Sequence, residues 1–163
     1  MFDVLALAAF AGLLLYAASS DIARLIIPNW VSIALAAIFP LAGLAHGMAW
    51  SEIGMHVLFG AAILAVGFFL FAANIIGGGD AKLLAAATVW TGFPAFMPFL
   101  FWTVVAGGLM AAALLAARQF LKAETSPPFV NHLLQKQNGI PYGVAIMVGG
   151  LMAIPALPFV LGR

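Results

Sequence analysis

The carboxylates are the residues of this sequence with the most chemistry to offer, and there are five of them: Asp3, Asp21, Glu52, Asp80 and Glu124. Asp80 stands out because it follows three glycines and precedes Lys82, between long apolar runs. An ionisable residue at membrane depth is costly and is a functional-site hypothesis by default. A second carboxylate within a few ångströms would share a proton with it. Such a pair supplies an acid and a base at one point, which can activate water and protonate a leaving amine.

The composition predicts that these residues are carried by membrane helices. Of the 163 residues, 66% are hydrophobic and 7% are charged, which is far from the composition of ordinary soluble domains. Apolar runs of about 17 to 25 residues span a bilayer as helices. We therefore expect an all-α, polytopic integral membrane protein, with residues 1–163 forming a single transmembrane domain. The polar breaks predict about six helices, over residues 4–19, 29–44, 53–73, 80–91, 95–117 and 140–161.

The basic residues predict how these helices are oriented. Five of the six Lys and Arg side chains follow the first, third and fifth predicted helices: Arg24, Lys82, Arg118, Lys122 and Lys136. By the positive-inside rule, that side is cytoplasmic and both termini lie on the non-cytoplasmic side. Asp21 and Asp80 then share the cytoplasmic side, at the end of the first helix and the start of the fourth. They can meet if those two helices pack together.

Two features of the sequence suggest that Asp80 is reached through a cavity. The predicted helix 80–91 is short, because about 12 residues reach only about 18 Å of a hydrocarbon layer about 30 Å thick. Irregular backbone at membrane depth also requires cover by protein or water. The glycines before Asp80 permit a close approach of backbone or of a substrate strand, since they carry no Cβ.

Other interpretations of the two carboxylates remain open on the residues alone. An aspartate at a helix N-terminus is often a cap that offsets the helix dipole, and Asp21 could pair with Arg24. A small ion- or proton-coupled carrier would use an intramembrane acid such as Asp80 in a similar way. A purely structural membrane component would need neither aspartate.

Two connections between the predicted helices carry further expectations. Pro28 ends the break that follows the first helix, and Asn29 is placed to cap the second helix. Residues 118–139 are the only long polar connection, within which residues 129–136 predict a short amphipathic helix at the membrane interface. Its length and proline content make this connection the candidate gate for substrate entry.

The sequence gives no reason to expect a metal, a cofactor or a nucleic acid. With no cysteine, the chain cannot form disulfides, a thiolate nucleophile or a zinc site that uses cysteine. His46 and His56 fall towards the outer side and His132 in the cytoplasmic connection, so one metal centre cannot gather all three. The net charge of +1 lacks the clustered Lys and Arg that phosphate backbones require.

Three motifs, in order along nearly the whole chain, resemble those of the prepilin peptidases, the membrane aspartic proteases of type IV pilus systems. The segment 77–83, Gly-Gly-Gly-Asp-Ala-Lys-Leu, is similar to the Gly-x-Gly-Asp-x-Lys-Leu motif of that family. Asp21 followed by Ile-Pro-Asn at 27–29 is similar to its first-aspartate region. Gly-Ile-Pro-Tyr-Gly at 139–143, with a further glycine at 149, is similar to its Pro-Tyr-Gly motif.

This resemblance implies a set of roles for individual residues. Asp21 and Asp80 would form the catalytic dyad. The residues that would shape the active site are Gly77, Gly79, Lys82, Pro141, Tyr142 and Gly143. Lys82 would tune the charge of the dyad or hold an acidic residue of the substrate, while the plainer interpretation is that it reaches the cytoplasmic headgroups. Tyr142 would supply a hydroxyl, although tyrosines are common at membrane interfaces.

The resemblance also implies a substrate and a location. The chain is similar to the short, peptidase-only members that serve tight-adherence (Flp-type) pili, because it has neither the cysteine pairs nor the room for the methyltransferase domain of the long members. The expected activity is removal of the short basic leader of a prepilin, after a glycine at the leader boundary. The expected location is the bacterial inner membrane, with the active site facing the cytoplasm. The expected partners are the prepilin, the lipid bilayer and the pilus assembly machinery.

Overall fold

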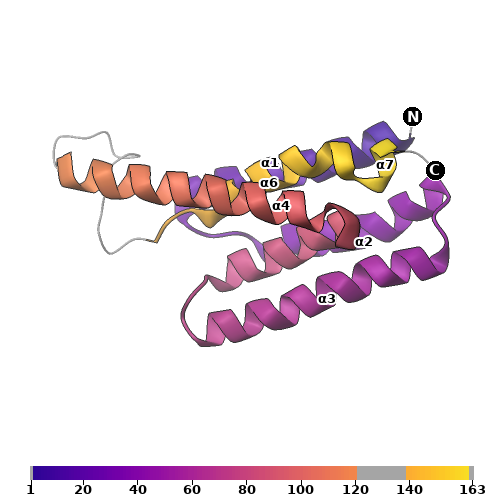
Figure 1. Cartoon of the computed structure of the whole chain (residues 1–163), viewed down its shortest axis with the longest axis horizontal. Helices are drawn as coiled ribbons and strands as arrows, with labels where there is room; N and C mark the ends of the chain where they lie inside the picture. Colours follow the sequence, from indigo (N-terminus) through magenta and orange to yellow (C-terminus); the bar gives the residue numbers. More distant parts are fainter. Residues whose placement is uncertain (1, 121–138, 162–163) are drawn as a thin grey trace.

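The computed structural model describes residues 2–120 and 139–161, and this part of the chain is helical, with no β-strand. Figure 1 shows the helices lying side by side along one long axis. Their bounds are α1 Phe2–Arg24, α2 Asn29–His46, α3 Trp50–Ala72, α4 Gly78–Phe120, α6 Tyr142–Ala153, the 3-10 helix η2 Ile154–Ala156 and α7 Pro158–Leu161. Within the described residues, five stretches are long and apolar enough to cross a membrane: α1, α2, α3, α4 and Tyr142–Val160. The expected multi-pass, all-helical fold is confirmed.

The long helix α4 consists of two arms that meet at Gly92. This residue has a non-helical backbone, with φ 56° and ψ −169°. The first arm, 78–91, packs antiparallel to α3: Gly60 lies against Val89, and a Cβ added at Gly67 would lie 3.0 Å from that of Ala81. Figure 1 shows the chain turning back at this point, so that the second arm, 93–120, runs in the opposite direction. The sequence predicts two separate helices here, 80–91 and 95–117, and the two arms correspond to them.

Helix α6 packs against the second arm of α4. Gly149 lies against Thr103 near one end of the contact, and Gly107 lies against the ring of Tyr142 near the other. The two segments are therefore antiparallel. Small residues allow this close approach, as is usual between membrane helices. The alternating directions bring the connections 25–28 and 73–77 and the start of α6 to one end of the bundle, which we call the aspartate end.

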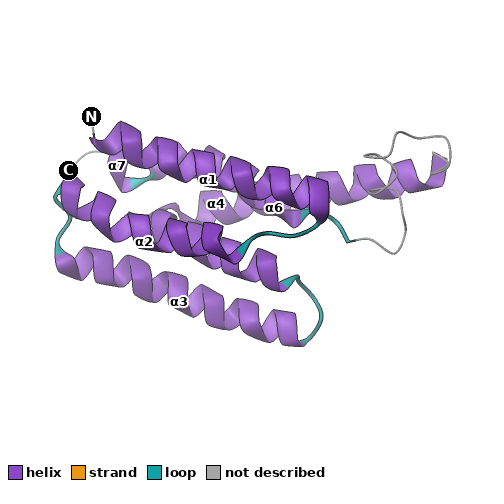
Figure 2. Cartoon of the chain, turned by 180° about the vertical axis from the view of Figure 1, so that it is seen from behind, coloured by secondary structure: helices purple, strands orange, loops and turns teal. Residues whose placement is uncertain are grey.

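The start of α1 and the end of α7 lie together at the opposite end of the bundle (Figures 1 and 2), which we call the terminal end. An even number of passes stays a prediction from the sequence. The side of the membrane on which the termini lie remains a prediction from the positive-inside rule.

A cluster of aromatic rings around Trp90 holds the bundle together. The Trp90 ring stacks on Phe10, with centroids 4.9 Å apart, and meets Phe39 edge to face at 5.7 Å. The centroid of the Phe159 ring lies 5.5 Å from that of Trp90, and the Trp90 Nε1 donates a hydrogen bond to the Leu35 carbonyl at 2.9 Å. Trp90 is fully buried. One side chain therefore joins α1, α2, α4 and α7, which fixes the first arm of α4 relative to α1.

Several predicted boundaries differ from the structure. Helix α1 continues to Arg24, so the break after it is limited to residues 25–28 and Asp21 lies within the last turn of the helix. The prediction that Asn29 caps the second helix is wrong: Pro28 is the N-cap, without a side-chain capping bond, and the Asn29 side chain bonds Lys82 instead. Helix α3 begins at Trp50, and the last span ends in η2 and α7. The predicted interfacial helix 129–136 lies outside the described residues.

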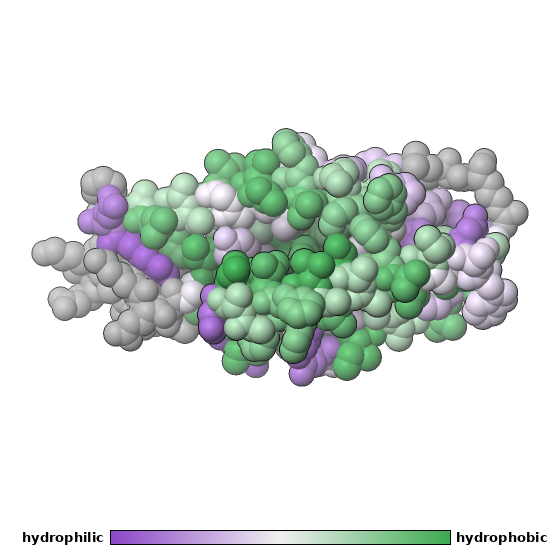
Figure 3. Space-filling view, turned by 60° about the horizontal axis from the view of Figure 1, so that its bottom comes forward, coloured by the Kyte–Doolittle hydropathy of each residue, from purple (hydrophilic) through white to green (hydrophobic). Residues whose placement is uncertain are grey.

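The surface agrees with a membrane environment. Hydrophobic side chains cover most of the face shown in Figure 3, and hydrophilic ones lie towards the two ends and at a few places along the lower edge. Large exposed side chains include Ile33, Leu58, Phe68 and Val104. Such an apolar belt would be a liability in water and is what lipid-facing helices require.

Candidate active site

Asp21 is held by two different parts of the chain. It lies in the last turn of α1 and is only 5% exposed. Its Oδ2 accepts a hydrogen bond of 2.7 Å from the backbone N–H of Gly143, at the start of α6. The first turn of a helix has N–H groups without intrahelical partners, and a carboxylate is a favourable acceptor for them. This bond fixes the rotamer of Asp21.

Asp80 lies in the first turn of α4 and is partly buried. Gly77 lies directly against it: a Cβ added at Gly77 would be 2.6 Å from Asp80 Oδ2, closer than real Cβ atoms come. The glycine is therefore needed for the carboxylate to keep its position. The next residues of the first arm, Ala81 and Leu83, are buried and anchor the helix that carries Asp80.

The fold brings the two aspartates to the same end of the bundle, close enough for their charges to interact. Phe10 lies against Trp90, and Ile27, just after α1, lies against Gly79 at the start of α4. These two contacts make α1 and the first arm of α4 antiparallel, so that the end of one helix faces the start of the other. Asp21 and Asp80 come from segments far apart in the sequence, and tertiary packing makes them neighbours.

The other glycines of the motifs pack against side chains at the site. A Cβ at Gly143 would lie 2.9 Å from Asp21 Oδ2, and a Cβ at Gly79 would lie 3.2 Å from the Cβ of Ile27. Pro141 is the N-cap of α6 and is buried. As at the start of many helices, a proline costs nothing there because the N–H it lacks would have no helical partner. It directs the chain so that the Gly143 N–H points at Asp21.

Gly77 and Gly143 lie directly against the carboxylates, whereas Tyr142 and Lys82 contact other helices. Tyr142 is 43% exposed, and its ring contacts the position of Gly107 on the second arm of α4. Lys82 Nζ donates a hydrogen bond of 3.0 Å to Asn29 Oδ1 on α2. Because Lys82 follows Asp80 by two positions, the two side chains leave α4 on different faces. The structure thus brings Lys82 to Asn29 rather than to a carboxylate within the described residues.

The histidines and the remaining described carboxylates lie at the terminal end. His46 Nδ1 is 2.6 Å from Asp3 Oδ1, joining the two helix termini. Glu52 Oε2 accepts a hydrogen bond from the Ala49 N–H at 2.8 Å. His56 Nδ1 donates to the carbonyl of Val89 at 2.9 Å, next to the break at Gly92. Glu124 and His132 lie outside the described residues.

The arrangement supplies the parts of an acid–base site. Two carboxylates lie near each other at the end of a helical bundle, and one of them is oriented by a main-chain donor. A water molecule between them could lose a proton to one carboxylate while the other donates a proton to a carbonyl oxygen. This is the chemistry of peptide-bond hydrolysis by a carboxylate pair.

The fold and the site together define a class, a multi-pass helical membrane protein with a pair of carboxylates at one end. The sequence profile of the type IV leader peptidase family matches residues 8–112, which is more than half of the chain and includes both aspartates. The chain belongs to the type IV leader peptidase family. No curated protein and no solved structure matches it. Family membership implies a protease that acts on a prepilin peptide, as the motifs predict.

Two contacts of the site have no signal in the sequence. The resemblance marks Gly143 as a residue that shapes the site, but only the structure identifies its N–H as the donor to Asp21. The bond between Lys82 and Asn29 is equally hidden, because both residues have ordinary roles at helix ends.

Proposed function

We propose that this leader peptidase is an aspartic endopeptidase whose catalytic groups are the carboxylates of Asp21 and Asp80. The observation that carries the proposal is their convergence at the aspartate end, with Asp21 held by the Gly143 N–H. Both residues lie inside the range matched by the family profile.

The proposed reaction needs one proton on the pair. The ionised aspartate takes a proton from water as the water oxygen attacks the scissile carbonyl carbon, and the protonated aspartate donates to the carbonyl oxygen. As the tetrahedral intermediate collapses, the C–N bond breaks and the first aspartate passes the proton taken from water to the leaving amine. The hydroxyl formed from the carbonyl oxygen returns its proton to the second aspartate as the C=O bond re-forms. The pair then again holds one proton, so no cofactor or metal enters the balance.

The proposed substrate is a prepilin of the tight-adherence (Flp-like) type, cleaved after the glycine at its leader boundary. Its hydrophobic helix would lie in the bilayer and its short basic leader in the cytoplasm, which puts the scissile bond at the cytoplasmic boundary. The charge distribution supports this location, because Arg24 ends α1, Lys82 lies near the start of α4 and Arg118 lies near the end of its second arm, which runs back past the aspartate end. The enzyme would then act in the bacterial inner membrane, beside the pilus assembly machinery.

Gly77, Gly79 and Pro141 have supporting roles in this proposal. Each keeps the main chain close to a carboxylate or to the segment that carries one, as their contacts suggest. Tyr142 is exposed near the start of α6, where its hydroxyl is available to a bound peptide. Lys82 is treated separately below, because its contacts lead to a different part of the molecule.

The decisive experiment is cleavage of an Flp-type prepilin in proteoliposomes by the variants Asp21→Asn and Asp80→Asn. Asparagine keeps the size of the side chain and an acceptor oxygen, so the Gly143 N–H still has a partner. Each variant is expected to lose cleavage altogether, since a single carboxylate cannot both accept and donate the proton. Glu52→Gln is the matched control, because it neutralises a carboxylate at the terminal end. Wild-type turnover by either aspartate variant would refute the two-aspartate mechanism.

A further inference from the structure

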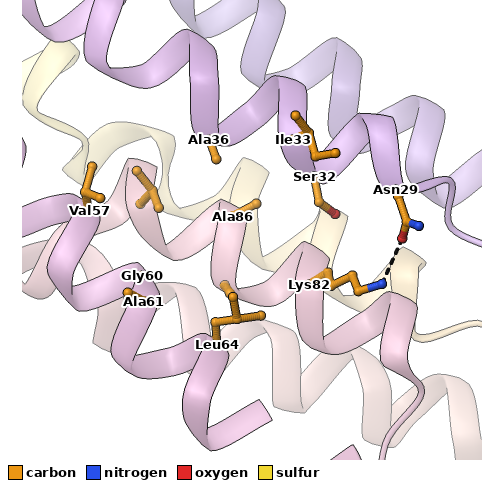
Figure 4. A pocket seen from close by; sticks show the side chains of 12 residues that line it. Asn29, Ser32, Ile33, Ala36, Val57, Gly60, Ala61, Leu64, Lys82 and Ala86 are labelled. Carbon is orange, nitrogen blue, oxygen red and sulfur yellow. Dashed lines mark hydrogen bonds between the residues drawn. The ribbon is translucent and has the colours of Figure 1, made fainter. Parts of the chain in front are cut away.

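A groove lies between α2, α3 and the first arm of α4, on a different face of α4 from Asp80. Helices α2 and α3 both pack on α4 but scarcely on each other. The space left between them has a volume of about 520 Å³, and Figure 4 shows the side chains around it. They are Asn29, Ser32, Ile33 and Ala36 of α2, Val57, Gly60, Ala61 and Leu64 of α3, and Lys82, Ala85, Ala86 and Val89 of α4.

The polar side chains of the groove all lie at its aspartate end. They are Lys82, Asn29 and Ser32, and the first two are joined by a hydrogen bond (Figure 4). Ser32 is only 7% exposed, and its Oγ has no hydrogen-bond partner within the described part of the chain. Burial of a hydroxyl without a hydrogen-bond partner lowers the free energy of unfolding by about 1–3 kcal/mol. Its position in the groove wall indicates that a ligand supplies the missing acceptor.

The charge at this end of the groove selects an anion. Within the described residues no carboxylate forms an ion pair with Lys82. Asn29 is the first residue of α2, and Lys82 lies in the second turn of α4, so the positive ends of two helix dipoles are also near. A group that is negatively charged and accepts hydrogen bonds could bind Lys82 and the Ser32 hydroxyl together.

The rest of the groove selects an apolar chain. From Lys82 to Val89 it follows seven residues of helix, which is about 10 Å. The walls beyond Ser32 are apolar, and the rim residues Ile33 and Leu64 are exposed on the face that lipids cover. An acyl chain that enters sideways from the bilayer would match both the apolar walls and the lipid-facing rim.

We propose that this groove binds one anionic phospholipid. The phosphate accepts hydrogen bonds from Lys82 Nζ and Ser32 Oγ, and an acyl chain lies along Ala36, Ala61 and Ala86. Basic pockets between membrane helices on the cytoplasmic side are a recurring form of lipid recognition. The site is separate from the carboxylate pair and does not depend on the proposed peptidase mechanism.

The test is lipid retention by the full-length protein. The protein is reconstituted with equal amounts of phosphatidylglycerol and phosphatidylcholine, extracted in mild detergent, and examined by native mass spectrometry. The wild type is expected to keep one phosphatidylglycerol in preference to phosphatidylcholine. Lys82→Gln is expected to reduce that retention about fivefold, which corresponds to about 1 kcal/mol. Arg24→Gln is the matched control, because it removes a cation at the same end that lies outside the groove.

Further variants test the binding of the acyl chain and the binding of the headgroup separately. Ala36→Leu combined with Ala61→Leu fills the groove from its rim and is expected to abolish retention, whereas Ala37→Leu, exposed on α2 outside the groove, is expected to leave it unchanged. Ser32→Ala is expected to lower retention without lowering the Tm in lipid-free detergent, because it removes a buried hydroxyl that lacks a partner there.

Four results would overturn the proposal. The first is equal retention of phosphatidylglycerol by Lys82→Gln and Arg24→Gln, and the second is equal retention of the two lipids by the wild type. The third is displacement of the lipid by millimolar inorganic phosphate, which would make this a free-anion site. The fourth is displacement by an equimolar prepilin, which would assign the groove to the substrate. Cleavage assays are not part of this test, so its outcome is independent of the roles of Asp21 and Asp80.

Discussion

The hydrogen bond from Gly143 to Asp21 can be tested by adding a single methyl group. In Gly143→Ala the new Cβ would lie 2.9 Å from Asp21 Oδ2 and 3.1 Å from its Cβ, so the Asp21 side chain has to move by several tenths of an ångström. The backbone bond of 2.7 Å is then lost or badly aligned. The backbone of residue 143 is helical, and alanine is a better helix former than glycine. The substitution therefore perturbs the carboxylate rather than the helix.

The size of the effect follows from the kind of bond. A hydrogen bond to a charged group contributes about 1.5–3 kcal/mol, and each 1.36 kcal/mol in the activation free energy is a tenfold change in rate. We expect Gly143→Ala to lower kcat for prepilin cleavage by about 10- to 150-fold. Its Tm should fall slightly, because a gain of about 1 kcal/mol in helix propensity only partly offsets the lost hydrogen bond.

The assay is a time course of prepilin cleavage in proteoliposomes, read on a gel, with Tm measured on the same preparation. Gly108→Ala is the matched control: this glycine is helical, and a Cβ there would meet nothing within 4 Å. If Gly143→Ala retains the wild-type kcat, the main-chain bond does not position Asp21 for catalysis. If Gly108→Ala loses as much activity as Gly143→Ala, the effect is not specific to the carboxylate.

Three further glycines give predictions of the same kind. Gly77→Ala would put a Cβ 2.6 Å from Asp80 Oδ2, so we expect at least about a tenfold loss of kcat in the cleavage assay, with a Tm near that of the wild type. Gly92→Ala would force a side chain into a backbone of positive φ and against the His56 ring. The strain of about 1–2 kcal/mol or more should lower Tm in detergent by at least about 2 °C, and an unchanged Tm would contradict the assigned turn. Gly149→Ala would meet the backbone of α4, and we expect a larger fall in Tm than from Gly12→Ala, where the space is open.

The sequence predicted the fold where local chemistry determines it. The apolar runs predicted the membrane-spanning stretches among the described residues, and the Gly92-Phe93-Pro94 stretch predicted the break inside α4. Boundaries were less accurate. The first helix was predicted to end at residue 19, but α1 continues to Arg24, because the first residue with a positive φ is Leu25 and Pro28 follows it. The capping prediction for Asn29 failed because its side-chain oxygen accepts a hydrogen bond from Lys82, a residue distant in sequence.

The candidate site was predicted in part, for a physical reason. The charge distribution placed Asp21 and Asp80 at one end, since lysines and arginines report on topology. Their approach depends on packing around Trp90, which links helices that are distant in sequence. The donor to Asp21 is a main-chain group, and every residue except proline carries one, so its use at Gly143 leaves no trace in residue types. The groove is hidden for a similar reason, because it lies where α2 and α3 diverge from each other on the surface of α4.

The break at Gly92 determines at which end of the bundle the later helices begin. A straight α4 of 43 residues would be about 64 Å long, and every later segment would emerge at the other end of the bundle. The start of α6 would then be a membrane thickness away from the end of α1, and the Gly143 N–H could not reach Asp21. One residue with a positive φ thus returns the chain to the aspartate end. The catalytic proposal depends on this reversal as much as on the two carboxylates, although Gly92 lies at the opposite end of the bundle from both.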